Sequence, residues 1–210
     1  MIISTGNLKG GCGCSSLLLL LAHYLAGGPK TVYLIDLSLQ GSLDLLYSRS
    51  LLLKERLPFG FFRSDIAKAL FLIGRLEEQN AVILLDLPKT FGEENLQSII
   101  EKIDRFIIPF QYGFTSLHAA TGFSLLIKRF AEQSKSIFLP NMNRPNERTD
   151  ELLESQEMLR SLGQLSAAIP LVPAMMNLRS MNLPPACLFQ LSPTLELLCN
   201  QYLLNLNHKS

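Results

Sequence analysis

The sequence predicts an α/β fold: a mostly parallel, doubly wound sheet with helices on both faces. Short apolar runs of strand length alternate with longer segments of helical pattern along the 210 residues. A glycine-rich loop directly follows the first apolar run, and acidic or amide residues follow several later ones. Parallel strands joined by right-handed crossovers bring such loops together at the carboxyl edge of the sheet, so we expect a ligand site there.

The predicted elements keep this alternation from end to end. The expected strands cover residues 1–5, 31–36, 81–86, 105–109, 136–140 and 166–170. The expected helices cover residues 14–26, 41–52, 64–77, 93–102, 115–133, 149–162 and 185–204. Segment 53–62 has no clear periodicity and is predicted to be irregular. For its aromatic residues, core packing is slightly favoured over contact with a partner.

Composition fits one domain that covers residues 1–210. Hydrophobic residues make up 48% of the chain and charged residues 18%, with a net charge of +1. A parallel sheet buried on both faces needs such an apolar sequence, which also suggests self-association. The near-neutral charge argues against a strong nonspecific DNA-binding surface, because phosphate binding needs concentrated Lys and Arg. A basic patch formed across a dimer remains an alternative.

Neither apolar runs nor cysteines indicate a membrane or metal protein. The run Leu17–Ala22 is too short to span a bilayer, and the C-terminal stretch lacks the basic face of a membrane-surface helix. The four cysteines lack the paired spacing of a structural zinc site. We therefore expect reduced thiols and a cytoplasmic location.

The first motif is the loop between residues 1–5 and the helix expected from residue 14. Residues 9–16 read Lys-Gly-Gly-Cys-Gly-Cys-Ser-Ser. A loop placed between a strand and a helix binds phosphate through backbone N–H groups and the helix dipole. The common pattern G-x-x-x-x-G-K-[ST] has a lysine where this chain has Cys14. The charge that usually contacts the β- and γ-phosphates is therefore missing.

The loop resembles the deviant Walker A motif, K-G-G-x-G-K-[ST], of the ParA/MinD family of partition and positioning ATPases. Lys9 matches the family lysine that reaches a nucleotide bound by the other subunit of a dimer. The resemblance implies a homodimer and a catalytic role for Lys9, with Mg²⁺ at Ser15. It also implies ATP bound by Gly10, Gly11, Cys12, Gly13, Cys14, Ser15 and Ser16.

Two further segments resemble the family's acidic motifs. The stretch from Asp36 to Gly41 stands where the family reads D-x-D-P-Q-G, so Asp36 matches the first acid and is assigned a catalytic role. Ser38 replaces the second acid, which in the family positions the attacking water. Residues 81–89 resemble a Walker B strand, which implies that Asp86 assists Mg²⁺. The Asp-Leu-Pro-Lys ending resembles the D-L-P-R of the CpaE/TadZ pilus-localising branch more than the D-T-P-P usual in ParA.

The later strands also match, so the resemblance covers nearly the whole chain. Residues 104–111 look like the family's next strand, which is followed by a long helix. Residues 136–143 resemble a strand that ends in the asparagine turned toward adenine, which implies this role for Asn141. Residues 168–173 resemble a further strand end, although the family's acid is absent there.

The resemblance leaves two functions open. The protein either binds ATP, dimerises through Lys9 and positions a cargo with a cargo or adaptor protein, or it is an inactive relative that serves as a scaffold or landmark for a pilus or conjugation machine. Cys14 and Ser38 favour slow or absent hydrolysis, because each replaces a charged family residue. Weak ATP binding is favoured by the retained residues, which are Lys9, the glycines, Ser15, Asp36 and Asp86. Whether the chain is an enzyme therefore stays open.

Overall fold

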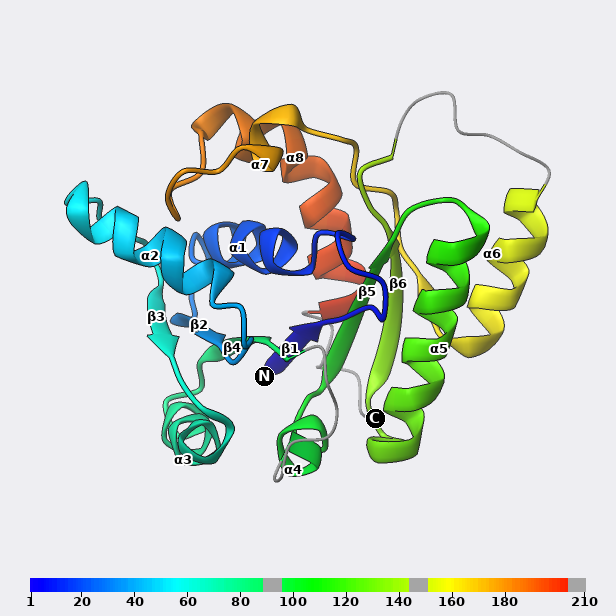
Figure 1. Cartoon of the computed structure of the whole chain (residues 1–210), viewed down its shortest axis with the longest axis horizontal. Helices are drawn as coiled ribbons and strands as arrows, with labels where there is room; N and C mark the ends of the chain where they lie inside the picture. The colour runs from blue at the N-terminus through cyan, green and yellow to red at the C-terminus, as the bar shows by residue number, and fades with distance from the viewer. Residues whose placement is uncertain (89–95, 144–150, 204–210) are drawn as a thin grey trace.

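The computed structural model describes residues 1–88, 96–143 and 151–203. A seven-stranded parallel sheet lies at its centre, in the order β3-β2-β4-β1-β5-β6-β7 (Figure 1). The strands are β1 (Ile2–Thr5), β2 (Val32–Asp36), β3 (Gly60–Arg63), β4 (Val82–Asp86), β5 (Arg105–Phe110), β6 (Lys135–Pro140) and β7 (Gln164–Leu165). The predicted parallel, doubly wound fold is confirmed.

Helices cover both faces of the sheet (Figure 1). One layer contains α1 (Cys14–Leu25), α2 (Ser42–Leu52), α7 (Pro173–Met176) and α8 (Pro185–Leu198), which continues into a π-helical turn at Cys199–Leu203. The other contains α3 (Ile66–Glu77), α4 (Leu96–Ile100), α5 (Phe114–Phe130) and α6 (Glu151–Leu162). The helix predicted at 93–102 is described only from residue 96, and residue 204 of the last predicted helix also lies outside the described residues.

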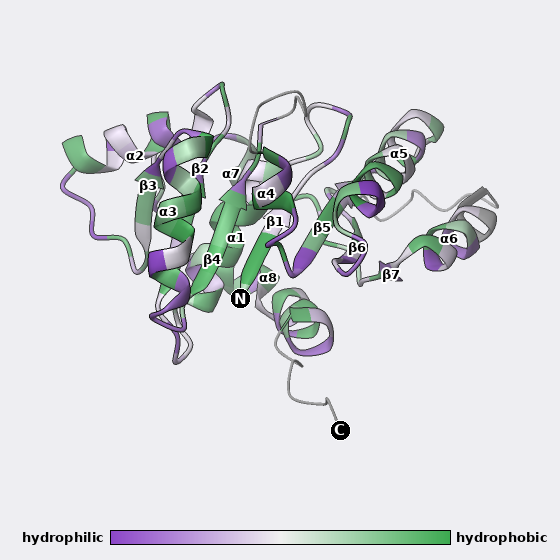
Figure 2. Ribbon diagram, turned by 90° about the horizontal axis from the view of Figure 1, so that it is seen from below, coloured by the Kyte–Doolittle hydropathy of each residue, from purple (hydrophilic) through white to green (hydrophobic). Residues whose placement is uncertain are grey.

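Two hydrophobic cores result, one on each face of the sheet. Successive strand residues point to opposite faces, so Ile3 joins the core under α1 and α8, whereas Ile2 joins the core under α3 and α5. All residues of β4 and β5 are buried, and the central strands are strongly hydrophobic in Figure 2. The leucines of α1 from Leu17 to Leu21 are buried too. Within the described residues no helix has the length and apolarity to cross a bilayer.

The structure corrects the prediction for segment 53–62. Its last residues begin β3, a four-residue edge strand paired with β2, while Phe59 is buried in the core. A side chain at Gly60 would lie 2.5 Å from the Tyr33 ring, so glycine is required where the two strands meet. Such a short, half-exposed strand carries no alternating pattern that a sequence could reveal.

The last predicted strand is also displaced. It was expected at residues 166–170, but β7 occupies Gln164–Leu165 and only Pro170 makes an isolated bridge, to Asn143. A proline has no N–H to donate to a ladder, which limits pairing at this end of the segment. The short helix α7 follows, in a region where no helix was predicted.

Candidate phosphate-binding site

The carboxyl ends of β1, β2 and β4 lie side by side. The register pairs Thr5 with Asp86, and Asp86 with Asp36. The glycine-rich loop leaves β1 at this edge and encloses, with its neighbours, a cavity of about 280 Å³. The predicted site residues that line the cavity are Lys9, Gly10, Gly11, Cys12, Gly13, Cys14, Ser15, Ser16 and Asp86, and Ser38 and Gln40 line it as well.

The loop conformation depends on glycine at position 13. Gly13 has φ 85°, in the left-handed region, and caps the N-terminus of α1. A Cβ there would lie 2.6 Å from Asn141 Nδ2 and 2.9 Å from the Met142 methyl group. Asn141 Nδ2 itself donates to the backbone oxygen of Cys12 at 2.8 Å. The predicted residue Asn141 therefore contacts the loop from the end of β6.

Sequence reasoning missed a second asparagine that holds the loop. Asn7 is buried at the start of the loop and donates through Nδ2 to the backbone oxygen of Pro109, at 2.9 Å. Its Oδ1 accepts from the Lys9 backbone N–H at 2.8 Å. Asn7 thus ties the loop to the end of β5, and a polar amide directly after a buried strand was the available signal.

A hydroxyl and a carboxylate meet at the base of the cavity. Ser15 Oγ donates to Asp86 Oδ2 at 2.7 Å, and Asp86 is buried. The buried Thr5 hydroxyl also lines the cavity, and its Oγ1 has no hydrogen-bond partner among the described residues. These oxygen donors fit Mg²⁺, which takes one or two protein ligands and completes its shell with phosphate and water. The described residues contain no cluster of three or more His, Cys, Asp or Glu suited to another metal.

Asp36 is held inside the protein and does not line the cavity. Its side chain is 0% exposed. Oδ1 accepts from Ser38 N at 2.8 Å, from Ser38 Oγ at 2.7 Å and from Arg63 at 3.0 Å, while Oδ2 accepts from Asp44 N at 3.2 Å. Arg63 also donates to the Ser38 backbone oxygen. The carboxylate therefore organises the loop after β2, and Arg63, at the end of β3, is a second residue that the sequence did not reveal.

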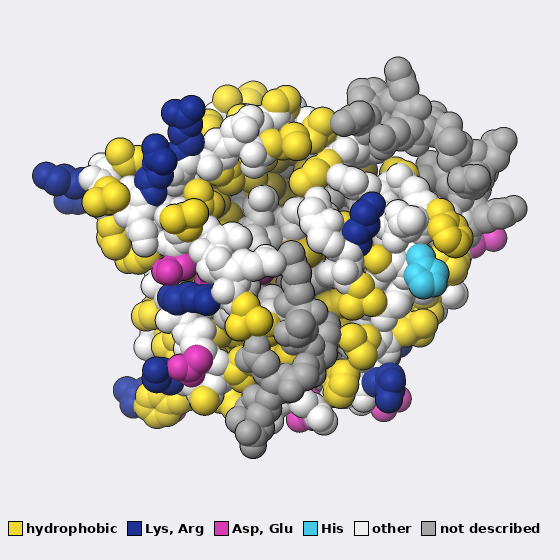
Figure 3. Space-filling model, viewed as in Figure 1, with side chains coloured by type: hydrophobic (Ala, Val, Ile, Leu, Met, Phe, Trp, Pro, Cys, Tyr) yellow, Lys and Arg dark blue, Asp and Glu magenta, His cyan; other side chains and the backbone are white. Residues whose placement is uncertain are grey.

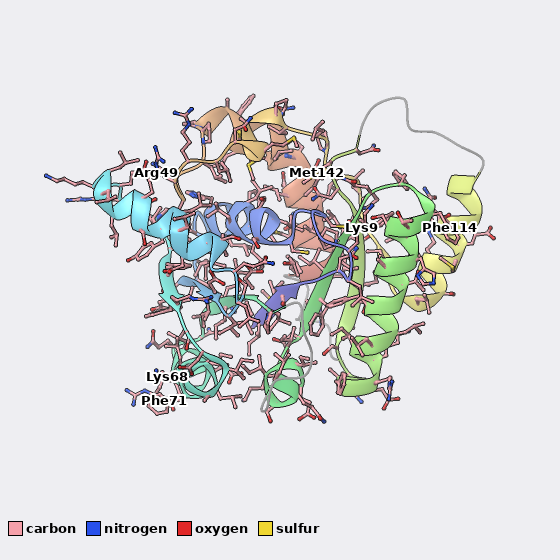
Figure 4. All side chains as sticks on the ribbon, viewed as in Figure 1. Lys9, Arg49, Lys68, Phe71, Phe114 and Met142 are labelled. Carbon is pink, nitrogen blue, oxygen red and sulfur yellow. The ribbon has the colours of Figure 1, made fainter. Side chains whose placement is uncertain are left out.

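Lys9 is exposed at the mouth of the cavity. Its Nζ lies 3.5 Å from Thr115 Oγ1 in the first turn of α5, and Figure 4 shows it on the same side of the molecule as Phe114. Cys14 is the first residue of α1 and lines the cavity at the position where the common motif has a lysine. Lys9 is thus the one Lys or Arg among the described residues that line the cavity.

An apolar pocket of about 40 Å³ adjoins the loop on the side of β6. Gly13, Ser16 and Asn141 line it, together with Met142, Pro170 and residues of α7 and α8. Met142 has φ 57°, uncommon for a residue other than glycine, and its sulfur accepts from Gln111 Nε2 at 3.3 Å. The loop thus lies between the larger cavity and this smaller, apolar pocket.

No protein-family model and no curated protein sequence matches the chain, but solved structures do. A plasmid partition protein from Borrelia burgdorferi, bound to AMPPNP, is 17% identical, covers 95% of this chain and 98% of its own, and has a TM-score of 0.72. A ParA family ATPase from Chlorobium tepidum is 18% identical over 95% and 96% of the two chains, with a TM-score of 0.70. A chain of the MinC:MinD cell division complex from Aquifex aeolicus is 17% identical over 85% and 84%, with a TM-score of 0.67.

The chain has the ParA/MinD fold. The fold that the glycine-rich loop predicted is therefore confirmed, since the matched structures cover nearly the whole chain. Identities of 17–18% show the ParA/MinD fold alone. What the chain binds has to be argued from its own site residues.

Proposed function

We propose that this protein is a ParA/MinD-type positioning protein of the cytoplasm whose single domain, residues 1–210, binds ATP weakly. The observation that carries the proposal is the Ser15–Asp86 hydrogen bond at the base of a cavity rimmed by the glycine-rich loop. A structural neighbour, the Borrelia partition protein, is bound to AMPPNP. The ParA/MinD fold and this local geometry together favour a nucleoside triphosphate over another ligand.

Each part of the site has a role in this proposal. Backbone N–H groups from Gly10 to Ser16 bind the phosphates, because they surround the cavity at the N-terminus of α1. Ser15 and Asp86 hold Mg²⁺, which neutralises charge on the β- and γ-phosphates when bound. The base occupies the adjoining apolar pocket, with Asn141 at its edge.

Weak binding follows from the residue at position 14. Without a charged partner there, the phosphates lose a charge-assisted hydrogen bond, about 1.5–3 kcal/mol. We therefore propose a micromolar or weaker affinity. Hydrolysis is slow or absent, because the Ser38 hydroxyl donates to Asp36 and carries no charge to position an attacking water.

Calorimetry with ATP, with and without Mg²⁺, tests this proposal. We expect weak binding that strengthens with Mg²⁺, and Ser15→Ala should abolish the Mg²⁺ dependence while leaving binding through the loop. Ser161→Ala, a change on α6 far along the chain, is the control and should bind like wild type. No heat and no stability shift at millimolar Mg-ATP would refute nucleotide binding.

The second candidate is an inactive scaffold or landmark for a pilus or conjugation machine. It is favoured by the replacement of two charged family residues by Cys14 and Ser38, which both line the same cavity. The double variant Cys14→Lys with Ser38→Asp separates the candidates, since restored charges should raise phosphate release if the remaining site is competent. Robust hydrolysis by the wild type, abolished by Asp86→Ala, would contradict impaired turnover.

A further inference from the structure

Helix α2 carries apolar residues on both sides. Its inner side packs Leu43 and Leu46 against the core under α1. Its outer side exposes Leu45 and Leu52, which lie seven residues apart and therefore share one face. Leu51 and Leu53 are also exposed beside them. The outer face of α2 therefore exposes several large aliphatic side chains close together, and such an exposed apolar cluster is typical of an interaction surface.

Cations surround these leucines. Arg49 lies on the same face as Leu45 and Leu52, four residues after the first and three before the second. Lys54 and Arg56 follow directly after the helix, and both are exposed. Two acids lie nearby. Asp44 is in the first turn of α2, and Glu55 accepts a hydrogen bond from Ser180 at 3.0 Å and so turns toward the protein.

The end of α2 is a folded element that stands away from the nucleotide site. Lys54 N donates to Leu51 O and Glu55 N donates to Ser50 O, both at 3.0 Å, in a helix-ending turn. Lys54 has φ 55° there, at a position that is usually glycine or asparagine. In this chain the turn therefore carries a cation. The 11-residue helix extends about 16 Å, and its far end projects from the body in Figure 1.

Figure 3 shows Lys and Arg side chains gathered around hydrophobic ones at this end of the molecule. We name the exposed residues Leu45, Arg49, Leu51, Leu52, Leu53, Lys54 and Arg56 the α2 tip. We propose that the α2 tip binds the surface of a bilayer that contains anionic phospholipids, with the leucines inserted between acyl chains and the cations on lipid phosphates.

The chemistry of the α2 tip favours a membrane over the other occupants. Segments that bind membrane surfaces combine apolar residues with Lys and Arg, because the apolar side chains insert into the bilayer and anionic lipids attract the cations. Binding hot spots between proteins are enriched in Trp, Tyr and Arg, with leucine under-represented. The α2 tip has two arginines but neither aromatic residue, and leucine is its most frequent residue. A surface that binds DNA would use the cations to contact phosphates, but it would have no use for the exposed leucines. The proposal goes beyond nucleotide binding and does not depend on it.

Vesicle co-sedimentation tests the inference. We expect the full chain to bind vesicles of phosphatidylcholine mixed with phosphatidylglycerol, and to bind phosphatidylcholine alone much more weakly. Leu52→Asp and Arg49→Glu should each weaken binding about tenfold or more, because one removes apolar insertion and the other reverses a charge. High salt should weaken binding of the wild type as well.

Phe189→Asp on α8 is the matched control, since Phe189 is 84% exposed and Leu52 82%. It should bind vesicles like the wild type, and thermal melting should show that all three variants fold. No binding to anionic vesicles would overturn the proposal, and so would equal loss in the control. A different result would identify the α2 tip as a nucleic-acid surface instead. In that case the wild type would bind duplex DNA but no vesicles, and DNA binding would be lost in Arg49→Glu but kept in Leu52→Asp.

Discussion

Single residues determine whether the glycine-rich loop can form. Gly11 and Gly13 both have left-handed φ values, of 79° and 85°, but their surroundings differ. A Cβ at Gly11 would meet open space, whereas one at Gly13 would collide with Asn141 and Met142. The loop therefore tolerates a side chain at one glycine far better than at the other, although both belong to the same motif.

This contrast gives the first prediction. Gly13→Ala should lower the free energy of unfolding by about 2–4 kcal/mol, because backbone strain adds to displacement of Asn141. Gly11→Ala should cost about 1–2 kcal/mol, from backbone strain alone. Urea denaturation of the two variants measures the difference. Equal losses would show that the contact between Asn141 and the loop is not tight in solution.

His23 gives a pH-dependent prediction. It lies in the last turn of α1, edge-on to Phe59, with Nε2 at 2.8 Å from the Met181 backbone oxygen. Burial lowers the pKa of His23 below its ordinary 6.5, and the hydrogen bond to Met181 opposes this shift. The unfolded chain thus binds its proton at higher pH than the folded chain does. The free energy of unfolding should fall as the pH drops through 6.5 toward the folded pKa.

The variant His23→Gln should flatten that decline, because glutamine can still donate to Met181 but does not titrate. His118→Gln is the control, since His118 is exposed on α5 and should leave the pH profile as in the wild type. Urea midpoints between about pH 5 and pH 8 measure the profile. A His23→Gln profile that declines as steeply as the wild type would assign the acid sensitivity to other groups.

At the scale of elements, the edge strand β3 stabilises the loop that follows β2. Arg63 bonds the Asp36 carboxylate and two backbone oxygens, so the end of β3 and residues 36–38 form one unit. Ser38 and Gln40 of this loop line the proposed nucleotide cavity. The position of β3 therefore affects the site, although no β3 residue lines it.

Arg63→Ala should lower the free energy of unfolding by about 1–3 kcal/mol, since it leaves a buried carboxylate without its cation. Arg63→Lys should recover only part, because a lysine does not reproduce the guanidinium geometry. Arg75→Ala, at an exposed position on α3, is the control. Urea denaturation measures the free energy of unfolding of each variant. An Arg63→Ala variant as stable as the wild type would show that β3 does not stabilise the loop after β2.

At the scale of the whole molecule, exposed apolar residues near the cavity favour dimerisation through this face. Leu8, Leu39 and Phe114 are exposed in the glycine-rich loop, the loop after β2 and the first turn of α5. Lys9 lies beside them with only a long contact, to Thr115. A two-fold dimer with the loops facing each other would cover this apolar rim and bring each Lys9 toward the nucleotide of the partner.

We therefore predict a dimer that Mg-ATP promotes and that Lys9→Ala weakens without lowering the melting temperature of the monomer. Light scattering with and without Mg-ATP measures it. Lys68→Ala is the control, because Lys68 pairs with Asp65 on α3 and should leave the assembly unchanged. A monomer under both conditions, or a dimer indifferent to both nucleotide and Lys9→Ala, would show that this chain lacks the switch.

The sequence alone is enough to predict the five inner strands of the sheet, the glycine-rich loop and the position of Asp86 at the end of β4. These are local signals, because a strand buried on both faces is a continuous apolar run and the loop is a contiguous motif. The same reasoning failed for β3 and β7, which are short and half-exposed and whose pairing depends on their neighbours.

The side chains that hold the site together become visible only in the folded chain. Asn7 binds Pro109, Asn141 binds Cys12 and Arg63 binds Asp36, and each pair is separated by between 27 and 129 residues. Asp36 matches a catalytic motif of the family, and only the folded structure shows that its carboxylate also holds Ser38, Arg63 and the start of α2 by hydrogen bonds. A buried polar group must find partners wherever the packed chain places them, and no local pattern encodes that choice.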